Sequence, residues 1–520
     1  MSDFKESTAE QGKLGLHEEK VTRLSVEEVE DLQGAAERGH HATDAYGHPL
    51  LHFDPAAEKR LVRKIDLFIV PTVAILYLFC FIDRANIGNA RLAGLEKDLG
   101  LVGFQYNILL TCFYISYILF EIPSNICCKY FGPGRWIPFI SFGFGLLSFL
   151  TALVTNFAQA AGVRFVLGIF EAGMLPGIAY YMSRWYRKAE LGFRLSLYIV
   201  MAPLAGAFGG LLASGLLKLP GIGRFHTWQQ LFLVEGVITM GLSVIAFFTL
   251  TDRPATARWL SEEEKALAIA RVKSENVGTT EVLDGLDKAK IKRGIFNPNT
   301  LTIAFIFLLD NITVQGLAFF LPTIVATIYP KASTIHKQLW TVPPYVVGAV
   351  FVLVIPYLSS RTRKYLIFYL MMAPLMSIGY IMFLATDAST GGTVRYAATF
   401  LIAAGAFPFG ALCNAQASAN TLSDTARSAG IGTVVMFGNV GGLISTWCFL
   451  PFDSPNYPIG NGLNLATSAT ISVLTVCLWI WLKRDNKRRD EVDVDATLSG
   501  LTEKQVHDLD WKHPAFRWKY

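Results

Sequence analysis

The sequence predicts an all-α membrane protein in which twelve transmembrane helices form two bundles of six. Three observations indicate this class. The 520 residues are 52% hydrophobic and 17% charged, which is more apolar and less charged than a soluble domain. Twelve apolar runs are long enough to cross a bilayer at ~1.5 Å per residue. A long charged segment, residues 251–299, separates the first six runs from the last six.

The charge balance and the cysteines exclude other classes of protein. The net charge of +5 lies mainly between the apolar runs, so it bears on orientation in the membrane and does not indicate nucleic-acid binding. The seven cysteines lie in or beside apolar runs, without the spacing of a disulfide framework or a zinc site, and we interpret them as packing residues. Because no nucleophile–base pair or metal cluster is visible, we expect neither an enzyme nor a metal or organic cofactor.

The first helix follows a polar tail. Residues 1–58 are rich in Glu, Gly, Ala and His and have no apolar segment, so we expect a solvated tail without a cleavable signal peptide. A basic cluster follows, consisting of Lys59, Arg60, Arg63 and Lys64. This cluster places that end in the cytoplasm by the positive-inside bias, and the apolar run Ile65–Ile82 then forms the first helix.

The other eleven runs lie at 105–127, 135–155, 158–182, 193–217, 230–250, 300–329, 337–358, 364–385, 393–422, 427–450 and 463–482. Alternate connections carry the positive residues, which predicts that both termini are cytoplasmic. The predicted domains are an N-terminal tail (1–58), an N-terminal bundle (59–250), a central cytoplasmic loop (251–299), a C-terminal bundle (300–483) and a C-terminal tail (484–520). Within the central loop, the Ser-Glu-Glu-Glu sequence at Ser261 predicts the start of an amphipathic helix that reaches Lys273.

Two charges lie near the end of the first apolar run. Asp83 and Arg84 would each cost on the order of 3 kcal/mol toward the middle of a spanning helix, so they persist there only in a wet or paired interior. An alternative is that both residues lie at the membrane surface and simply end the helix. The position alone leaves the two possibilities open.

The residues around these charges resemble a known family. Asp83-Arg-Ala-Asn-Ile-Gly-Asn-Ala90, followed by Gly94-Leu-x-x-Asp-Leu99, is similar to the first-helix signature of the anion:cation symporter branch of the major facilitator superfamily, in particular its fungal allantoate/nicotinate permease group. The resemblance covers about residues 59–485. It implies two six-helix halves around a central cavity, the major facilitator fold.

One loop departs from the superfamily pattern. Between the second and third predicted helices, Gly132 and Arg135 fit the pattern, but Lys129 occupies the position of its usual Asp. The acid that this loop normally contributes to the cytoplasmic gate is therefore missing from it.

The fourth predicted helix contains a second pair of charges. Arg164 and Glu171 are seven residues apart, which places both on one helical face. Their spacing is similar to that of proton-coupled organic-anion transporters of the same branch. The resemblance implies that Asp83 and Glu171 bind protons, that Arg84 holds a substrate carboxylate, and that Arg164 pairs with an acid. The alternative is a structural ion pair that ties this helix to a neighbour.

Other polar residues are candidates for substrate contact. Tyr77 lies on the face of Arg84 and either lines the substrate path or anchors the helix at the interface. Asn311, Gln315 and Asn414 in the C-terminal bundle either hydrogen-bond the uncharged part of a ligand or join helices. Glu121 is interpreted as structural, and the sequence from Trp228 to Gly236 as a marker of the sixth helix.

These features predict a proton-coupled importer of a small organic anion, such as nicotinate or a related carboxylate, that works by alternating access. We expect a monomer in the lipid bilayer of the plasma membrane, with protons as the coupling ion and no nucleic-acid partner. The alternatives are a proton-antiport exporter of a metabolite or drug, and a nutrient sensor that does not transport. The Gly-Pro-x-x-Gly-Gly pattern of exporters is poorly matched at Ala202–Gly210, which favours import.

Overall fold

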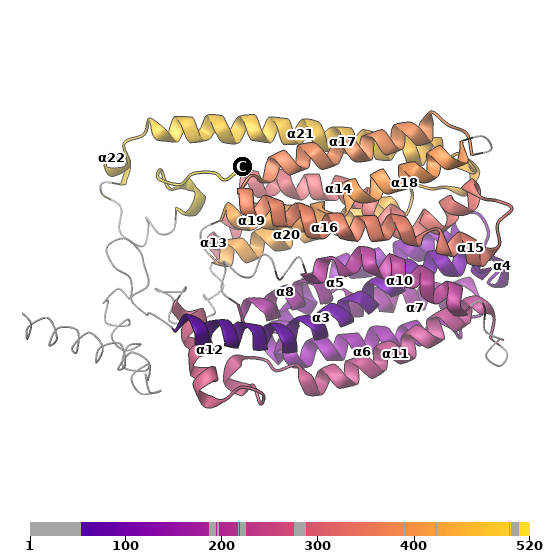
Figure 1. Cartoon of the computed structure of the whole chain (residues 1–520), viewed down its shortest axis with the longest axis horizontal. Coiled ribbons are helices and arrows are strands. Elements are labelled where there is room, and N and C mark those ends of the chain that lie inside the picture. Colours follow the sequence, from indigo (N-terminus) through magenta and orange to yellow (C-terminus); the bar gives the residue numbers. More distant parts are fainter. Residues whose placement is uncertain are drawn as a thin grey trace, which may run out of the picture.

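The computed structural model describes residues 54–186, 194, 197–216, 218, 225–274, 288–388, 391–421, 424–498, 500 and 509–520. Within these residues every regular element is a helix (Figure 1). Residues 1–53 of the predicted N-terminal tail therefore lie outside the described residues. The first described helix, α3, begins at Pro55, four residues before the predicted bundle, because the Asp54 side chain caps it by accepting hydrogen bonds from the amides of Ala56 and Ala57.

The helices form two groups joined by a charged segment. The N half comprises α3 (Pro55–Leu92), α4 (Leu95–Asp98), α5 (Gln105–Phe131), α6 (Pro133–Thr151), α7 (Phe157–Glu171), α8 (Met174–Ser183), α10 (Met201–Leu216) and α11 (Thr227–Thr249). The C half comprises α14 (Pro298–Ile328), α15 (Thr334–Leu339), α16 (Val342–Thr362), α17 (Tyr365–Leu384), α18 (Gly392–Ala406), α19 (Phe409–Ala419), α20 (Asp424–Ser445) and α21 (Pro458–Asp490). Figure 1 shows the two halves side by side, with their long helices roughly parallel to one axis.

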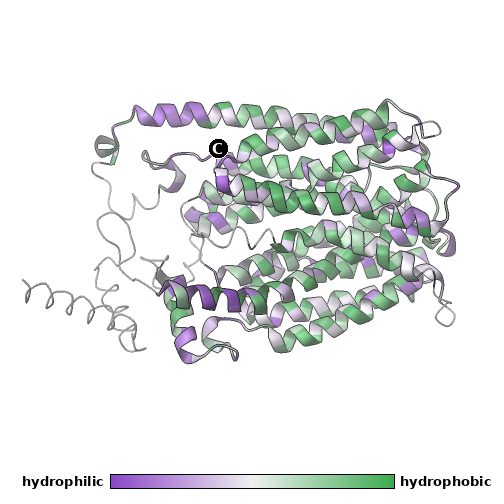
Figure 2. Cartoon of the chain, in the orientation of Figure 1, coloured by the Kyte–Doolittle hydropathy of each residue, from purple (hydrophilic) through white to green (hydrophobic). Residues whose placement is uncertain are grey.

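The predicted class, an all-α membrane protein, is confirmed. Eleven helical stretches of the described residues are long and apolar enough to cross a membrane. Hydrophobic residues cover the middle of the long helices and hydrophilic residues gather toward the ends (Figure 2). Large apolar side chains on the outer helices, among them Leu119, Phe248 and Val473, are exposed, as expected for surfaces that face lipid.

The third of the twelve predicted runs is the helix α6, which is not among the eleven. It has only 19 residues, so any stretch of it long enough to span a membrane includes Gly134, Arg135 and Pro138 of its first turns. It nevertheless packs along α11 and α7 as a member of the N half. Close contact with α11 is possible because Gly236 lies directly against the backbone of α6 at Phe149.

An acid from another part of the chain lies at the start of α6, next to the loop that lacks its usual Asp. Asp252, which follows α11, accepts a hydrogen bond of 2.7 Å from the backbone N–H of Gly134. A carboxylate at this position satisfies a free N–H at the beginning of the helix and interacts favourably with the helix dipole. Gly132 has a φ of 87° and leaves no room for a Cβ beside Asp252. The acid expected within the loop is thus supplied by another part of the chain.

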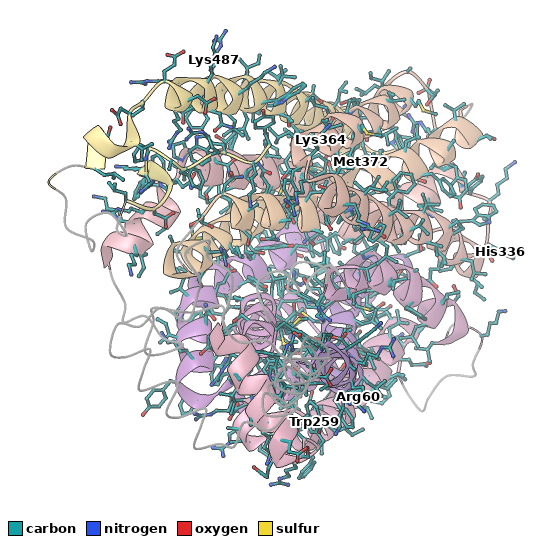
Figure 3. All side chains as sticks on the ribbon, turned by 60° about the vertical axis from the view of Figure 1, so that its left-hand side comes forward. Arg60, Trp259, His336, Lys364, Met372 and Lys487 are labelled. Atoms are coloured by element: carbon teal, nitrogen blue, oxygen red, sulfur yellow. The ribbon has the colours of Figure 1, made fainter. Side chains whose placement is uncertain are left out.

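The central segment attaches to both halves. The predicted helix from Ser261 is confirmed as α12 (Glu262–Ser274), and Ser261 and Glu264 cap its start reciprocally. Lys64 of α3 pairs with Glu264 at 2.6 Å, and Trp259 stacks on Phe68 of α3 at 4.8 Å between ring centroids. Figure 3 shows Trp259 in the N half, with Lys364 and Lys487 in the C half. The helix α13 (Lys288–Ile295) packs instead against α20 of the C half.

The segment 509–520 packs against the C half. α21 continues to Asp490, beyond the predicted end of the bundle at 483. Trp518 is buried and its indole N–H donates to Asp485 at 2.6 Å. The backbone of Lys519 exchanges hydrogen bonds of 2.8 and 3.0 Å with the amide of Asn420 at the end of α19. This part of the predicted tail is therefore folded onto α19 and α21.

The two halves meet at one end. We call the end that carries α12 and α13 the α12 end, and the opposite end, with α4 and α15, the α15 end (Figure 1). Asn107 of α5 donates to the carbonyl of Thr446 at 2.6 Å, and Thr111 contacts Thr446 and the Trp447 indole at 3.2 and 3.0 Å. Among the described residues, the hydrogen bonds between the halves lie toward the α15 end, apart from one between Glu121 and Asn439. The molecule is closed at the α15 end.

Candidate functional site

Two ion pairs join α3 to α7 in the interior of the N half. Arg84 Nε lies 2.8 Å from Glu171 Oε2, and Arg164 Nη1 lies 3.1 Å from Asp83 Oδ2. All four side chains are buried, with exposed fractions of 5% or less. Ionised groups are tolerated at such depth only when they are paired, so the two arginines and the two acids neutralise each other here.

The pairing decides two questions that spacing left open. Asp83 and Arg84 are buried inside the N half, so the alternative that they end the first helix at the membrane surface is wrong. Arg164 and Glu171 share a helical face as predicted, but they do not pair with each other. Each instead binds the oppositely charged residue of α3, so Arg164 does tie its helix to a neighbour through an acid.

Aromatic rings surround the Arg84 guanidinium. Its central carbon lies 4.8 Å from the ring centroid of Phe81, 5.4 Å from that of Phe113 and 4.8 Å from that of Tyr117. Rings at these distances attract a cation through their quadrupoles and keep water away from it. Because only its Nε binds Glu171, the end of the guanidinium fork contributes no further hydrogen bond to a carboxylate in this state.

Glu171 has a second polar contact. Cys80, one turn before Arg84 on α3, donates from Sγ to Glu171 Oε2 at 3.5 Å. The other oxygen, Oε1, is buried and has no hydrogen-bond partner. A carboxylate with an unpartnered oxygen is stabilised less by hydrogen bonds than one with every lone pair satisfied. The ionised form of Glu171 is therefore stabilised mainly by Arg84.

A further buried acid of the N half was missed by the sequence analysis. Glu235 of α11 is 1% exposed, and Asn86 Nδ2 donates to its Oε2 at 2.6 Å. The segment containing Glu235 was interpreted only as a marker of the sixth helix. The signal that singled out Glu171, an acid within an apolar run, applies equally to Glu235.

The predicted substrate-contact residues are not brought together by hydrogen bonds. Tyr77 is buried against Tyr198 and Phe81, with both centroid distances 5.0 Å, and is not an interfacial anchor. Asn311 and Asn414 donate to carbonyls one turn earlier in their own helices, and Gln315 has an unpartnered Oε1. These three amides lie on α14 and α19.

A small hollow lies between the two halves near this cluster. From the N half it is lined by Phe81 and Ala85 of α3 and by Ala202 and Gly206 of α10. The C half contributes Val314, Ala318, Tyr345 and Phe407. Phe81 is also one of the rings over Arg84, so the hollow and the buried cation share a wall. Its lining is apolar, and three of its eight residues are aromatic.

Two further acids lie apart from these ion pairs. Glu121 of α5 accepts a hydrogen bond of 2.9 Å from Asn439 of α20, which is a contact between the halves. Asp310 of α14 is fully buried in the C half and neither of its oxygens has a hydrogen-bond partner. The interpretation of Glu121 as structural fits its position, because it holds the two halves together.

The sequence matches a family model over residues 73–446, and that model is described as the Major Facilitator Superfamily. An uncharacterized transporter of Schizosaccharomyces pombe is 34% identical over 470 residues, which cover 89% of this chain and 91% of the relative. The high-affinity nicotinic acid transporter of Saccharomyces cerevisiae is 30% identical over 464 residues, covering 89% of this chain and 85% of the relative.

Solved structures share the fold. The xylose transporter XylE from E. coli, in a partially occluded inward-open conformation, aligns with a TM-score of 0.60 at 13% identity, covering 78% of this chain and 97% of that chain. A bacterial homolog of the human lysosomal transporter Spinster aligns with a TM-score of 0.57 at 14% identity, covering 82% and 96%. At these identities the likeness concerns the arrangement of helices alone.

Proposed function

The chain belongs to the Major Facilitator Superfamily of membrane transporters, and we propose that it imports a small organic anion together with protons. The observation that carries the proposal is the Arg84–Glu171 pair, in which a permanent cation is held by a group that can be neutralised. We place the chain in the anion:cation symporter branch, near the fungal allantoate/nicotinate permeases. The nicotinic acid transporter of yeast, at 30% identity, supports that placement.

Competition for Arg84 couples the proton to the anion. A proton that binds Glu171 removes the charge that neutralises Arg84, and the guanidinium then requires another anion in its dry surroundings. A substrate carboxylate fits this requirement because it accepts two parallel hydrogen bonds from the fork. Asp83 and Arg164 form the second pair of the same cluster, in which Asp83 can also take a proton.

The hollow between the halves marks where the rest of the substrate would bind. In this state its volume is about 10 Å³, room for no more than one water molecule, so the halves must first move apart. The apolar body of the substrate then lies between Phe81, Tyr345 and Phe407, while its carboxylate turns toward Arg84. Nicotinate has this combination of a flat ring and one carboxylate. Asn311, Gln315 and Asn414 of the C half offer amides to a polar atom of the ring when the halves rearrange.

Energetics give a reason for coupling. Moving one negative charge inward costs ~2.3 kcal/mol per 100 mV of inside-negative potential, so an anion accumulates only if protons accompany it. We assign the α12 end to the cytoplasm, where the basic residues gather, and the protein to the plasma membrane. The closure at the α15 end then corresponds to a carrier that is shut toward the outside.

A panel of labelled monocarboxylates tests the proposal. Cells that express the protein should take up at least one of them, nicotinate first among the candidates, above cells with an empty vector. Absence of uptake for the whole panel, with the protein present at the surface, would contradict import. Faster efflux from preloaded cells would instead support the exporter.

A further inference from the structure

Glu235 is a buried acid that pairs with no cation among the described residues. It lies in the middle of α11, and its Oε2 accepts the hydrogen bond from Asn86, whereas its buried Oε1 has no partner within the described part of the chain. Asn86 is fully buried as well. An amide satisfies one lone pair of a carboxyl group but does not neutralise its charge.

The charges of the neighbouring helices do not compensate Glu235. α11 packs on α6, α3 and α10. α10 has no charged residue, and the one charged residue of α6, Arg135, lies in its first turn at the α12 end. Among the described residues, the charged groups that act most strongly on Glu235 are Asp83, Arg164 and Glu171.

The net charge of this cluster determines whether Glu235 is ionised or protonated. Arg164 is paired with Asp83 and Glu171 with Arg84, so the four charges cancel. An ionised Glu235 would add one uncompensated negative charge to this dry cluster, which is strongly unfavourable. A neutral carboxyl group avoids that cost and still accepts the hydrogen bond from Asn86.

A chain of amides leads from Glu235 to the closure at the α15 end. Asn86, which donates to Glu235, accepts a hydrogen bond of 3.1 Å from Asn89 Nδ2. The backbone carbonyl of Asn89 in turn accepts from Gln338 Nε2 of α15 at 3.5 Å. Gln338 belongs to the C half, so this last contact crosses between the halves.

We propose that Glu235 is a third proton-binding residue of the N half, that it is protonated while the α15 end is closed, and that it exchanges this proton with water that enters past Asn86 and Asn89 when that end opens. Separation of the halves at the α15 end would remove Gln338 from Asn89 and admit water to the two asparagines. The role in transport rests on the proposed function, whereas the protonation itself does not.

Infrared spectroscopy of the purified protein tests the protonation without any substrate. At neutral pH the wild type should show the C=O stretching band of a protonated carboxyl group that shifts in D2O, and Glu235→Gln should lose one such band. The same change on an exposed acid of the central segment, Glu263→Gln, should leave the band in place. Identical wild-type and Glu235→Gln spectra would overturn the proposal. Should Glu235→Gln not fold, Glu235→Asp must move the band to another frequency, and an unmoved band would likewise overturn it.

Proteoliposomes test the role in coupling, with labelled nicotinate as the probe. One proton fewer per cycle lowers accumulation by about tenfold for each pH unit of the imposed gradient, so Glu235→Gln should fall below the wild type by that factor. An unchanged ratio would show that Glu235 only holds Asn86. A wild type that ignores the gradient while the infrared band is present would refute the proposed function and leave the protonation standing.

Discussion

Arg84 of α3 and Glu171 of α7 form a buried ion pair in which Nε and Oε2 are 2.8 Å apart. The arginine cannot lose its charge, but the glutamate can gain a proton, so the pair is held together by one group that switches and one that does not. A substrate anion that reaches Arg84 must therefore displace Glu171 or wait for its protonation. Five predictions test this relationship and its surroundings.

Arg84→Lys should weaken substrate binding by roughly ten- to a hundredfold. Lysine keeps the charge but replaces the planar fork by a point charge, and a lost hydrogen bond to a charged group costs about 1.5–3 kcal/mol. Binding of labelled nicotinate to the purified variant measures the effect. An unchanged Kd, with normal surface expression, would remove Arg84 from the substrate site.

Uptake should rise as the external pH falls and collapse when a protonophore is added. The reason is that protons must neutralise an acid of the cluster before Arg84 becomes available to the anion. Initial rates of uptake at several external pH values, with and without sodium, provide the measurement. Dependence on sodium combined with indifference to pH would contradict proton coupling.

Glu171→Gln should retain substrate counterflow but lose accumulation driven by a proton gradient. Glutamine imitates the protonated carboxyl group, so Arg84 stays available on both sides of the membrane and no longer responds to protons. Both activities are measured on the same reconstituted protein, with Glu263→Gln, a change at an exposed acid of α12, as the matched control.

The outcome separates coupling from structure. Loss of both activities together with a lower melting temperature would mean that Glu171 chiefly stabilises Arg84 in the fold. Retention of both activities would mean that Glu171 has neither role.

Arg164→Met should reduce stability by about 3–5 kcal/mol, because it leaves Asp83 charged and unpaired in the interior. The double variant Asp83→Asn with Arg164→Met should recover much of that loss, since neither charge of this pair then remains. Thermal unfolding of the single and double variants in detergent measures the coupling. Equal, additive losses from the two changes would show that the ion pair contributes nothing to the fold.

Gly206→Ala should reduce transport strongly, by about tenfold, by obstructing the contact between the halves. A Cβ at Gly206 would lie 2.5 Å from the Tyr345 ring, whose hydroxyl is held by the carbonyl of Leu317 at 3.0 Å. Gly215→Ala on the same helix is the control, because a Cβ there has no neighbour within 4 Å.

Helix propensity favours both alanines by about 1 kcal/mol, so poorer helix formation cannot explain a loss of transport. Equal transport by the two variants would show that the fit of Gly206 against Tyr345 is unimportant.

Much of the fold follows from the sequence because length and apolarity are local properties. The eleven apolar stretches and the helix from Ser261 were found in this way, and the capping by Asp54 moved only a boundary. α6 was identified as an apolar run although it is short and begins with Gly134 and Arg135.

The site was predicted in part. Asp83, Arg84, Arg164 and Glu171 stood out because charges are costly within apolar runs. Their partners could not be predicted, because pairing depends on how α3 and α7 are rotated and aligned, which spacing along one helix does not reveal. Glu235 was missed because its segment was interpreted only as a pattern shared widely across the superfamily. Asp252 was missed because it reaches the start of α6 only after α11 has packed against α6.

The two helices of the central segment pack on different halves, and this indicates where the chain can be divided. α12 pairs with Lys64 of the N half, and Trp259 just before it stacks on Phe68. α13 lies against α20 of the C half. A break in the chain between Ser274 and Lys288 would leave these contacts intact in both fragments. The two halves are therefore suited to expression as separate polypeptides that reassemble in the membrane, and a half from a relative could replace either one.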